Sequence, residues 1–118
     1  MTDAVQSYLN QNPGEAQDIL EKLARQPSVR AQNLGMQAAA DLTESLLKET
    51  GFQTRQLVVE GAPAFVYGEL KGKSDYTLLL YNHYDVQPAE PLELWESEPY
   101  TPTIRDGKML EISCGNIV

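Results

Sequence analysis

The sequence predicts an α/β fold in which N-terminal helices pack on a mixed β-sheet. Apolar residues recur at three- and four-residue spacing in the first fifty residues, which is typical of helices that bury one face. Two short runs rich in β-branched and aromatic residues follow, and an uninterrupted apolar run comes after them. Helices followed by strands of these kinds indicate a sheet that the helices cover.

The first third of the chain is expected to hold two main helices. Asn12 offers a capping oxygen and Pro13 suits the first helical position, while Pro27 ends this helix. The residues before Asn12 form either a short separate helix or an extension kinked at Pro13. A second helix is predicted from about 33 to 50, with Gly51 as its left-handed cap. The apolar positions are Ala16, Ile19, Leu20, Leu23 and Ala24 in the first helix, and Ala38, Leu42, Leu46 and Leu47 in the second.

A change of pattern after Gly51 predicts strands. Residues 53–60 and 64–70 are expected to pair antiparallel across the turn at 61–63. The run from Tyr76 to Tyr81 is apolar without alternation, as in a strand buried on both faces. We therefore expect this run to be the central strand of the sheet.

The chain from Val86 onward is rich in proline and is expected to be mostly loop. A short strand near 103–105 and a turn at Asp106-Gly107 are predicted within it. Trp95 is interpreted as an anchor for this loop, with a binding surface as the alternative. Four glutamates form an acidic cluster, interpreted as solvated with metal capture as the alternative: Glu90, Glu93, Glu96 and Glu98.

The length, net charge and cysteine content of the chain disfavour several functional classes. The 118 residues suit one small domain, 1–118, and carry a formal net charge of −8. That charge disfavours nucleic acid and anionic membranes as partners. The sequence lacks an apolar stretch of about 20 residues and a secretory leader, so a cytoplasmic location is expected. The single cysteine, Cys114, excludes an internal disulfide and fits a reducing compartment.

The residues best suited to chemistry follow the predicted central strand. His83 is the only histidine, and Asp85 lies two residues further on. In an extended chain their side chains point the same way, while Asn82 and Tyr84 point the other way. A carboxylate beside an imidazole fixes its tautomer and strengthens the other nitrogen as a metal ligand. On spacing alone, an ordinary hydrogen-bonded histidine is the alternative.

A longer pattern resembles the first metal-binding segment of the di-zinc metallo-exopeptidases, a family of carnosinase-like dipeptidases, aminoacylases, acetylornithine deacetylase and succinyl-diaminopimelate desuccinylase. The runs that carry the resemblance are YNHYDVQPAEPLELW at 81–95, PYTP at 99–102, RDGK at 105–108, QPSV at 26–29 and GF at 51–52. The resemblance extends from about Ala4 to Lys108, and the HYDVQP and PLxxW pattern is most similar to the dipeptidase branch.

This resemblance implies a partial catalytic domain of a zinc exopeptidase fold, without the lid and dimerisation domain. It implies that His83 is the first zinc ligand and that Asp85 is the catalytic carboxylate that orients it. In the family, two zinc ions share a bridging carboxylate and a water, a later glutamate is the general base, and the substrate is a dipeptide or an N-acyl amino acid. Bound zinc lowers the pKa of the attacking water toward neutrality.

The sequence departs from the family pattern after Lys108. The family continues with Gly-Arg-Gly and then Ser-Asp-Asp-Lys-Gly, whereas residues 109–118 contain no aspartate to bridge the zinc ions. The run is either a remnant of that segment or out-of-frame sequence. Cys114 is interpreted as a non-catalytic thiol, with zinc ligation as the alternative. We expect a metallopeptidase fragment that is inactive alone; the alternative is a non-catalytic association module that self-associates through an incomplete sheet.

Overall fold

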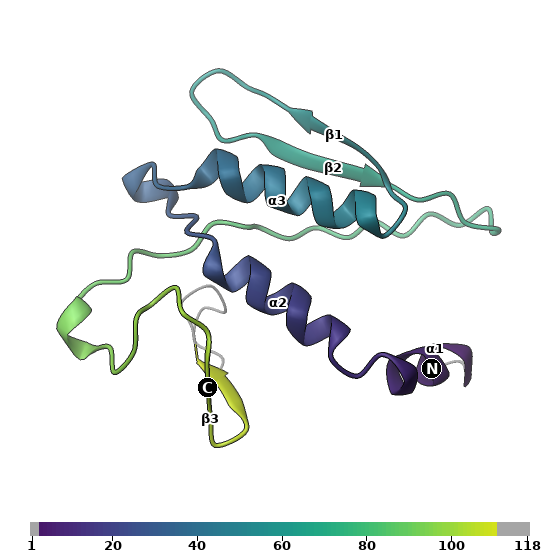
Figure 1. Cartoon of the computed structure of the whole chain (residues 1–118). Coiled ribbons are helices and arrows are strands. Elements are labelled where there is room, and N and C mark those ends of the chain that lie inside the picture. Colours follow the sequence, from purple (N-terminus) through teal and green to yellow (C-terminus); the bar gives the residue numbers. More distant parts are fainter. Residues whose placement is uncertain (1–2, 111–118) are drawn as a thin grey trace.

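The computed structural model describes residues 3–110 and consists of helices followed by two small antiparallel sheets (Figure 1). The helices are α1 (Asp3–Gln11), α2 (Glu15–Arg25), the short 3-10 helix η1 (Arg30–Gln32), α3 (Met36–Glu49) and the 3-10 helix η2 (Leu92–Leu94). The strands are β1 (Gln53–Leu57), β2 (Phe65–Glu69), β3 (Thr103–Arg105) and β4 (Lys108–Leu110). The predicted α/β class, with N-terminal helices on a sheet, is confirmed.

The helix boundaries differ from prediction at the N-terminal ends. Helix α1 is a separate helix, and Gly14 caps α2 without any side-chain bond, so the predicted Asn12 cap is wrong. The Asn12 amide instead donates to the Tyr8 carbonyl oxygen at 3.0 Å, because it sits at the end of α1. Helix α3 begins at Met36, three residues after the predicted start at Asn33, which adopts a left-handed conformation after η1.

Two glycines shape the ends of α3. Gly35 precedes the helix with φ of 69°, and a Cβ built on it would lie 2.0 Å from the Pro27 carbonyl oxygen. Gly51 follows the helix with φ of 91° and donates to the Lys48 carbonyl oxygen, while Phe52 donates to that of Leu47. This bond pattern is a Schellman motif, and it confirms the predicted glycine cap.

The β1–β2 hairpin lies against α3 on one face only (Figure 1). Thr54 and Gln56 on its inner face hydrogen-bond to side chains of α3. The outer face has Arg55, Leu57, Phe65 and Tyr67, and the Arg55 guanidinium lies 4.7 Å from the centre of the Tyr67 ring. The hairpin confirms the predicted antiparallel pair, and its outer apolar face is exposed.

The core is small and consists mainly of alanine. Val29 is the largest fully buried side chain. The buried apolar residues are Ala24, Val29, Met36, Ala39, Ala40, Ala64 and Ala89. The buried side chains therefore lie on α2, the loop after it, the first turns of α3 and the segments around residues 64 and 89.

The predicted central strand at Tyr76–Tyr81 is wrong within the described part of the chain. These residues form no strand, and Tyr76 and Leu79 are 94% and 85% exposed. A buried strand needs a partner at each edge and a layer on each face. Among the residues that the structure describes, each strand of the two hairpins pairs only with its own partner. The run therefore stays extended and solvent-exposed below α3 in Figure 1.

The last described elements match the prediction for the proline-rich region. Strand β3 pairs with β4 across Asp106 and Gly107, whose φ angles of 51° and 74° suit a type I′ turn. Strand β4 was not predicted, and Cys114 lies outside the described residues.

None of the helices in residues 3–110 is long and apolar enough to cross a bilayer.

Candidate metal centre

His83 lies where the exposed run joins a segment that is fixed to the rest of the chain. The Tyr84 hydroxyl donates to the Ala64 carbonyl oxygen at 2.6 Å, and the Val86 N–H donates to the Ser28 carbonyl oxygen at 2.9 Å. Ser28 is itself buried, as is Ala89. The backbone on the C-terminal side of His83 is therefore held by both the β1–β2 connection and the loop after α2.

The His83 ring is oriented by Asp85. Its Nδ1 atom lies 2.9 Å from the Asp85 carbonyl oxygen and 3.2 Å from Asp85 Oδ1. Both are acceptors, so in the neutral ring the proton sits on Nδ1 and Nε2 keeps its lone pair. The His83 side chain is 73% exposed and that of Asp85 is 46% exposed. The Nε2 atom therefore belongs to an exposed ring whose other nitrogen is already hydrogen-bonded to a partly covered aspartate.

Tyr84 is a site residue for which sequence reasoning predicted only that it would point away from His83. Partial burial raises the pKa of the Tyr84 hydroxyl, and the negative charge of Asp85 raises it further. The hydroxyl therefore stays protonated at neutral pH and keeps donating to Ala64. The contact joins residues twenty positions apart, so local pattern gives no signal for it.

The rest of a metal site is not assembled in residues 3–110. No group of three or more His, Cys, Asp or Glu side chains in this range is placed to hold a metal ion. Two glutamates of the predicted acidic cluster have other partners: Glu90 accepts from Gln32, and Glu96 pairs with Arg105. Even a catalytic zinc needs about three protein ligands. The donor chemistry of His83 and Asp85 fits one ligand and its orienting partner, and no more.

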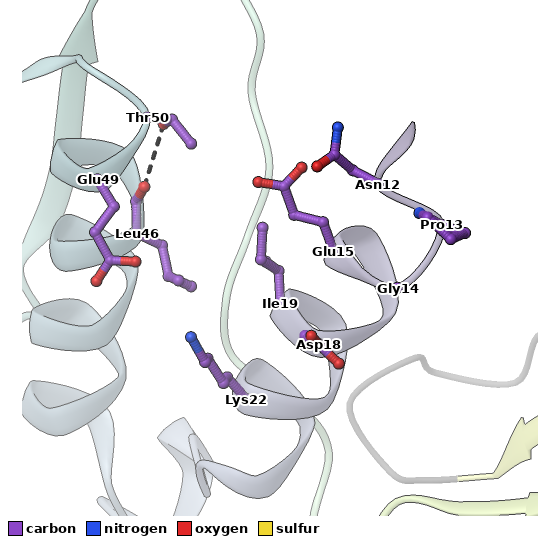
Figure 2. Close-up of a pocket in the computed structure, with 10 residues that line it drawn as sticks. All are labelled: Asn12, Pro13, Gly14, Glu15, Asp18, Ile19, Lys22, Leu46, Glu49 and Thr50. Atoms are coloured by element: carbon purple, nitrogen blue, oxygen red, sulfur yellow. Dashed lines mark hydrogen bonds between the residues drawn. The ribbon is translucent and has the colours of Figure 1, made fainter. Parts of the chain in front are cut away.

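Two shallow grooves lie away from His83. One runs between the start of α2 and the end of α3, where Figure 2 shows Lys22 pointing toward α3 and Glu49 on the opposite wall. The other is lined by η2, the half-buried Trp95 and Pro99. Nearly all side chains of the first groove are exposed, so neither its carboxylates nor its lysine is desolvated to hold a ligand.

The sequence was compared with protein-family models and with curated proteins. No protein-family model matches the chain. The chain is 38% identical over 98 residues to succinyl-diaminopimelate desuccinylase of Cupriavidus taiwanensis, covering 77% of this chain and 24% of that protein. It is 37% identical over 90 residues to the desuccinylase of Stenotrophomonas maltophilia K279a, covering 76% and 23%.

A solved structure is similar over most of the chain. This is the crystal structure of an M20 family metallo-carboxypeptidase, Sso-CP2, from Sulfolobus solfataricus. It matches with a TM-score of 0.80 and 28% identity, covering 85% of this chain and 23% of that one. The fold, with His83 and Asp85 at the end of its extended run, is thus that of a metallo-exopeptidase.

The chain belongs to the M20 exopeptidase family, as both its sequence and its fold show. It spans about a quarter of the length of the curated relatives it matches. Those relatives are desuccinylases, so the closer likeness to the dipeptidase branch stays a prediction.

Proposed function

We propose that this chain supplies the first metal ligand of a two-zinc amide hydrolase. His83 would bind zinc through Nε2, and Asp85 would orient the ring by accepting the Nδ1 proton. The single observation that supports this assignment is the position of Nδ1, 2.9 Å and 3.2 Å from two Asp85 oxygens. A carboxylate or carbonyl acceptor at the second nitrogen is the usual companion of a zinc-bound histidine.

The residues around His83 would set the geometry of the reaction centre. Zinc, when bound, polarises the amide carbonyl and lowers the pKa of the attacking water. Asp85 holds the proton on Nδ1, and so keeps the Nε2 lone pair available. Tyr84 and Val86 fix the backbone on which both side chains stand, because each is bonded to a distant segment. The substrate class would be a dipeptide or an N-acyl amino acid. The names of the relatives, succinyl-diaminopimelate desuccinylase and metallo-carboxypeptidase, support this class.

We further propose that the 118-residue chain alone has negligible hydrolase activity. One histidine and one orienting carboxylate cannot hold two zinc ions that share a bridging ligand.

Zinc titration by calorimetry, on the wild type and on His83→Ala, tests the ligand assignment. Weak binding that disappears in the variant is the expected result, whereas equal binding by both proteins contradicts the role of His83. Hydrolysis of a dipeptide and of an N-succinyl amino acid is measured in parallel. Chelator-sensitive turnover by the isolated chain would contradict the proposed inactivity.

A second candidate function, a non-catalytic association module, is favoured by the exposed apolar run at Tyr76–Tyr81. Open strand edges and uncovered apolar side chains promote association. Light scattering of the metal-free chain tests this: a concentration-dependent rise in mass supports association, and a constant monomer mass contradicts it.

A further inference from the structure

We infer that Asp106 is a site of covalent modification: it isomerises to isoaspartate through attack by the Gly107 backbone nitrogen, and the product separates strand β3 from strand β4. This inference is independent of the metal chemistry proposed for His83, because it concerns the turn of a different hairpin.

The reaction needs only the two turn residues and water. The Gly107 nitrogen attacks the Cγ carbon of the Asp106 side chain in its carboxylic acid form. The N–Cγ bond forms, the nitrogen gives up its proton, and one carboxyl oxygen leaves as water. A second water then opens this succinimide at the backbone carbonyl carbon and breaks the bond from that carbon to the Gly107 nitrogen. The chain now runs through the Asp106 side chain, and neither an oxidant nor a reductant is consumed.

The first observation is the residue that follows the aspartate. Asp106 is the only aspartate or asparagine of the chain that precedes a glycine. A Cβ on the following residue hinders attack by its nitrogen and restricts the backbone rotation that brings nitrogen and carboxyl together, and glycine lacks that Cβ. Apart from its chain neighbours, no described atom lies within 4 Å of the place where a Cβ on Gly107 would be. The rotation therefore meets no obstacle.

The second observation is that the turn is exposed and its backbone is strained. Asp106 and Gly107 are both exposed, and Asp106 has a φ of 51°, a left-handed conformation that is uncommon for a residue with a side chain. Within residues 3–110, the one ion pair made from this hairpin joins Arg105 to Glu96. No salt bridge in this range therefore holds the Asp106 carboxyl away from the Gly107 nitrogen.

The third observation is that the hairpin carrying this turn is short. Strands β3 and β4 share three register pairs, and Ile104 is 57% exposed. Figure 1 shows this yellow hairpin apart from α3 and from the β1–β2 hairpin, and among the described elements β3 and β4 make their main contacts with each other. A two-stranded hairpin by itself is marginally stable in water, and such units open locally at little cost in free energy. Opening releases the turn and lets the nitrogen reach the carboxyl.

Isomerisation then prevents the hairpin from closing again. A two-residue type I′ turn reverses the chain only when both of its residues are left-handed and the backbone has its normal length. Isoaspartate adds the Cβ carbon of Asp106 to the backbone and so lengthens the turn. The pairing of Arg105 with Lys108 is lost, and with it the register of the two strands. Since Arg105 also pairs with Glu96, the change reaches the segment after η2.

The test follows the intact 118-residue chain for several weeks at physiological temperature, both native and unfolded in guanidinium chloride. Peptide mapping by mass spectrometry, with methyl labelling by an isoaspartyl methyltransferase, measures isoaspartate at each aspartate. In the native chain, it should form at Asp106 at least about tenfold faster than at Asp75, an exposed aspartate that is followed by Tyr76. The native rate at Asp106 should lie within about tenfold of the unfolded rate, because opening costs little.

Two variants separate the chemistry from the opening of the turn. Asp106→Glu should form no isomer, because its longer side chain closes the ring far more slowly, and a weaker turn would only make the residue more accessible. Gly107→Ala should slow the reaction, although a φ of 74° disfavours alanine and loosens the turn. A faster reaction in Gly107→Ala would overturn the role assigned to the glycine.

NMR spectroscopy of the purified isoaspartyl chain checks the structural consequence. Cross-strand contacts between Ile104 and Met109, which are register partners, should disappear while those of the β1–β2 hairpin remain. Isoaspartate that forms no faster at Asp106 than at Asp75 would overturn the inference. So would a native rate more than about tenfold below the unfolded rate, or intact contacts between Ile104 and Met109 in the isomer.

Discussion

The Gln56 side-chain amide donates to Asp41 Oδ1 at 2.8 Å and so ties strand β1 to helix α3. The same amide donates to Glu44 Oε2 at 3.0 Å. Glu44 also accepts from Thr54 and pairs with Lys48 at 2.8 Å. The contact between the hairpin and its helix is thus a network of charge-assisted hydrogen bonds.

This network predicts a loss of stability in acid. Hydrogen bonds from Gln56 and then Gln37 lower the pKa of Asp41, and those from Lys48, Thr54 and Gln56 lower the pKa of Glu44. Carboxyls with lowered folded-state pKa values stabilise the fold above their unfolded pKa, and that stabilisation is lost as pH falls through the folded value. The urea concentration at the unfolding midpoint should therefore decrease as the pH is lowered from about 5 to about 3.

The matched test of this acid effect is a variant that cannot titrate. The double variant Asp41→Asn/Glu44→Gln should be less stable than the wild type at pH 7. It should also lose less unfolding free energy when the pH is lowered from 5 to 3. Glu93→Gln, on the exposed η2 segment, removes a charge outside the network. Its unfolding free energy should change with pH as that of the wild type does. If the double variant also showed the wild-type change with pH, the network would not be the cause of the acid effect.

Gly35→Ala should destabilise the chain more than any other glycine-to-alanine change at the ends of the helices. Its φ is 69° and the added Cβ would meet the Pro27 carbonyl oxygen at 2.0 Å. Gly51→Ala, with φ of 91° and open space, should cost only about 1 kcal/mol of unfolding free energy. Gly14→Ala has neither constraint and should stay within about 0.5 kcal/mol. Urea unfolding ranks the three, and a Gly35→Ala protein as stable as Gly51→Ala would contradict the close approach.

Tyr84→Phe should lower both stability and zinc affinity. It removes the 2.6 Å bond to the Ala64 carbonyl oxygen and leaves that acceptor unpaired next to the buried Ala64 side chain, at a cost of about 1 kcal/mol. Tyr81→Phe, at a tyrosine that is 83% exposed, is the matched control and should change neither property. Loss of stability in both variants would mean that the hydroxyl contact is not the cause.

Asp85→Ala should reduce zinc affinity by about tenfold, the lower end of the range for residues that support a metal ligand. The loss is limited because the Asp85 carbonyl oxygen, 2.9 Å from Nδ1, remains as an acceptor in the variant. Calorimetric titration measures the change, with Asp75→Asn as a control for the loss of one negative charge. Zinc affinity unaffected by Asp85→Ala would assign the orienting role to the backbone carbonyl alone.

The parts of the fold that depend on residues close together in the sequence were predictable from the sequence. The glycine cap of α3, the β1–β2 hairpin and the turn at 106–107 all follow from local patterns of apolar, glycine and turn residues. The placement of His83 beside Asp85 was predictable for the same reason, since an extended chain repeats every two residues.

The features that sequence reasoning missed depend on distant partners. Apolar character predicts that residues 76–81 can be buried, but burial requires neighbouring strands that residues 3–110 do not provide. The bond between Tyr84 and Ala64 joins two loops, and no periodic pattern marks either end. Asn12 was predicted to cap the start of α2 but lies at the end of α1, because asparagine suits both the start and the end of a helix.

An alanine-rich interior has a thermodynamic consequence for the isolated chain. Val29 is the largest wholly buried side chain of residues 3–110, so unfolding of this part hydrates little additional hydrocarbon. The heat-capacity increment and the denaturant slope scale with that newly hydrated area. Calorimetry of the chain on its own should therefore show a broad, low-enthalpy melting transition.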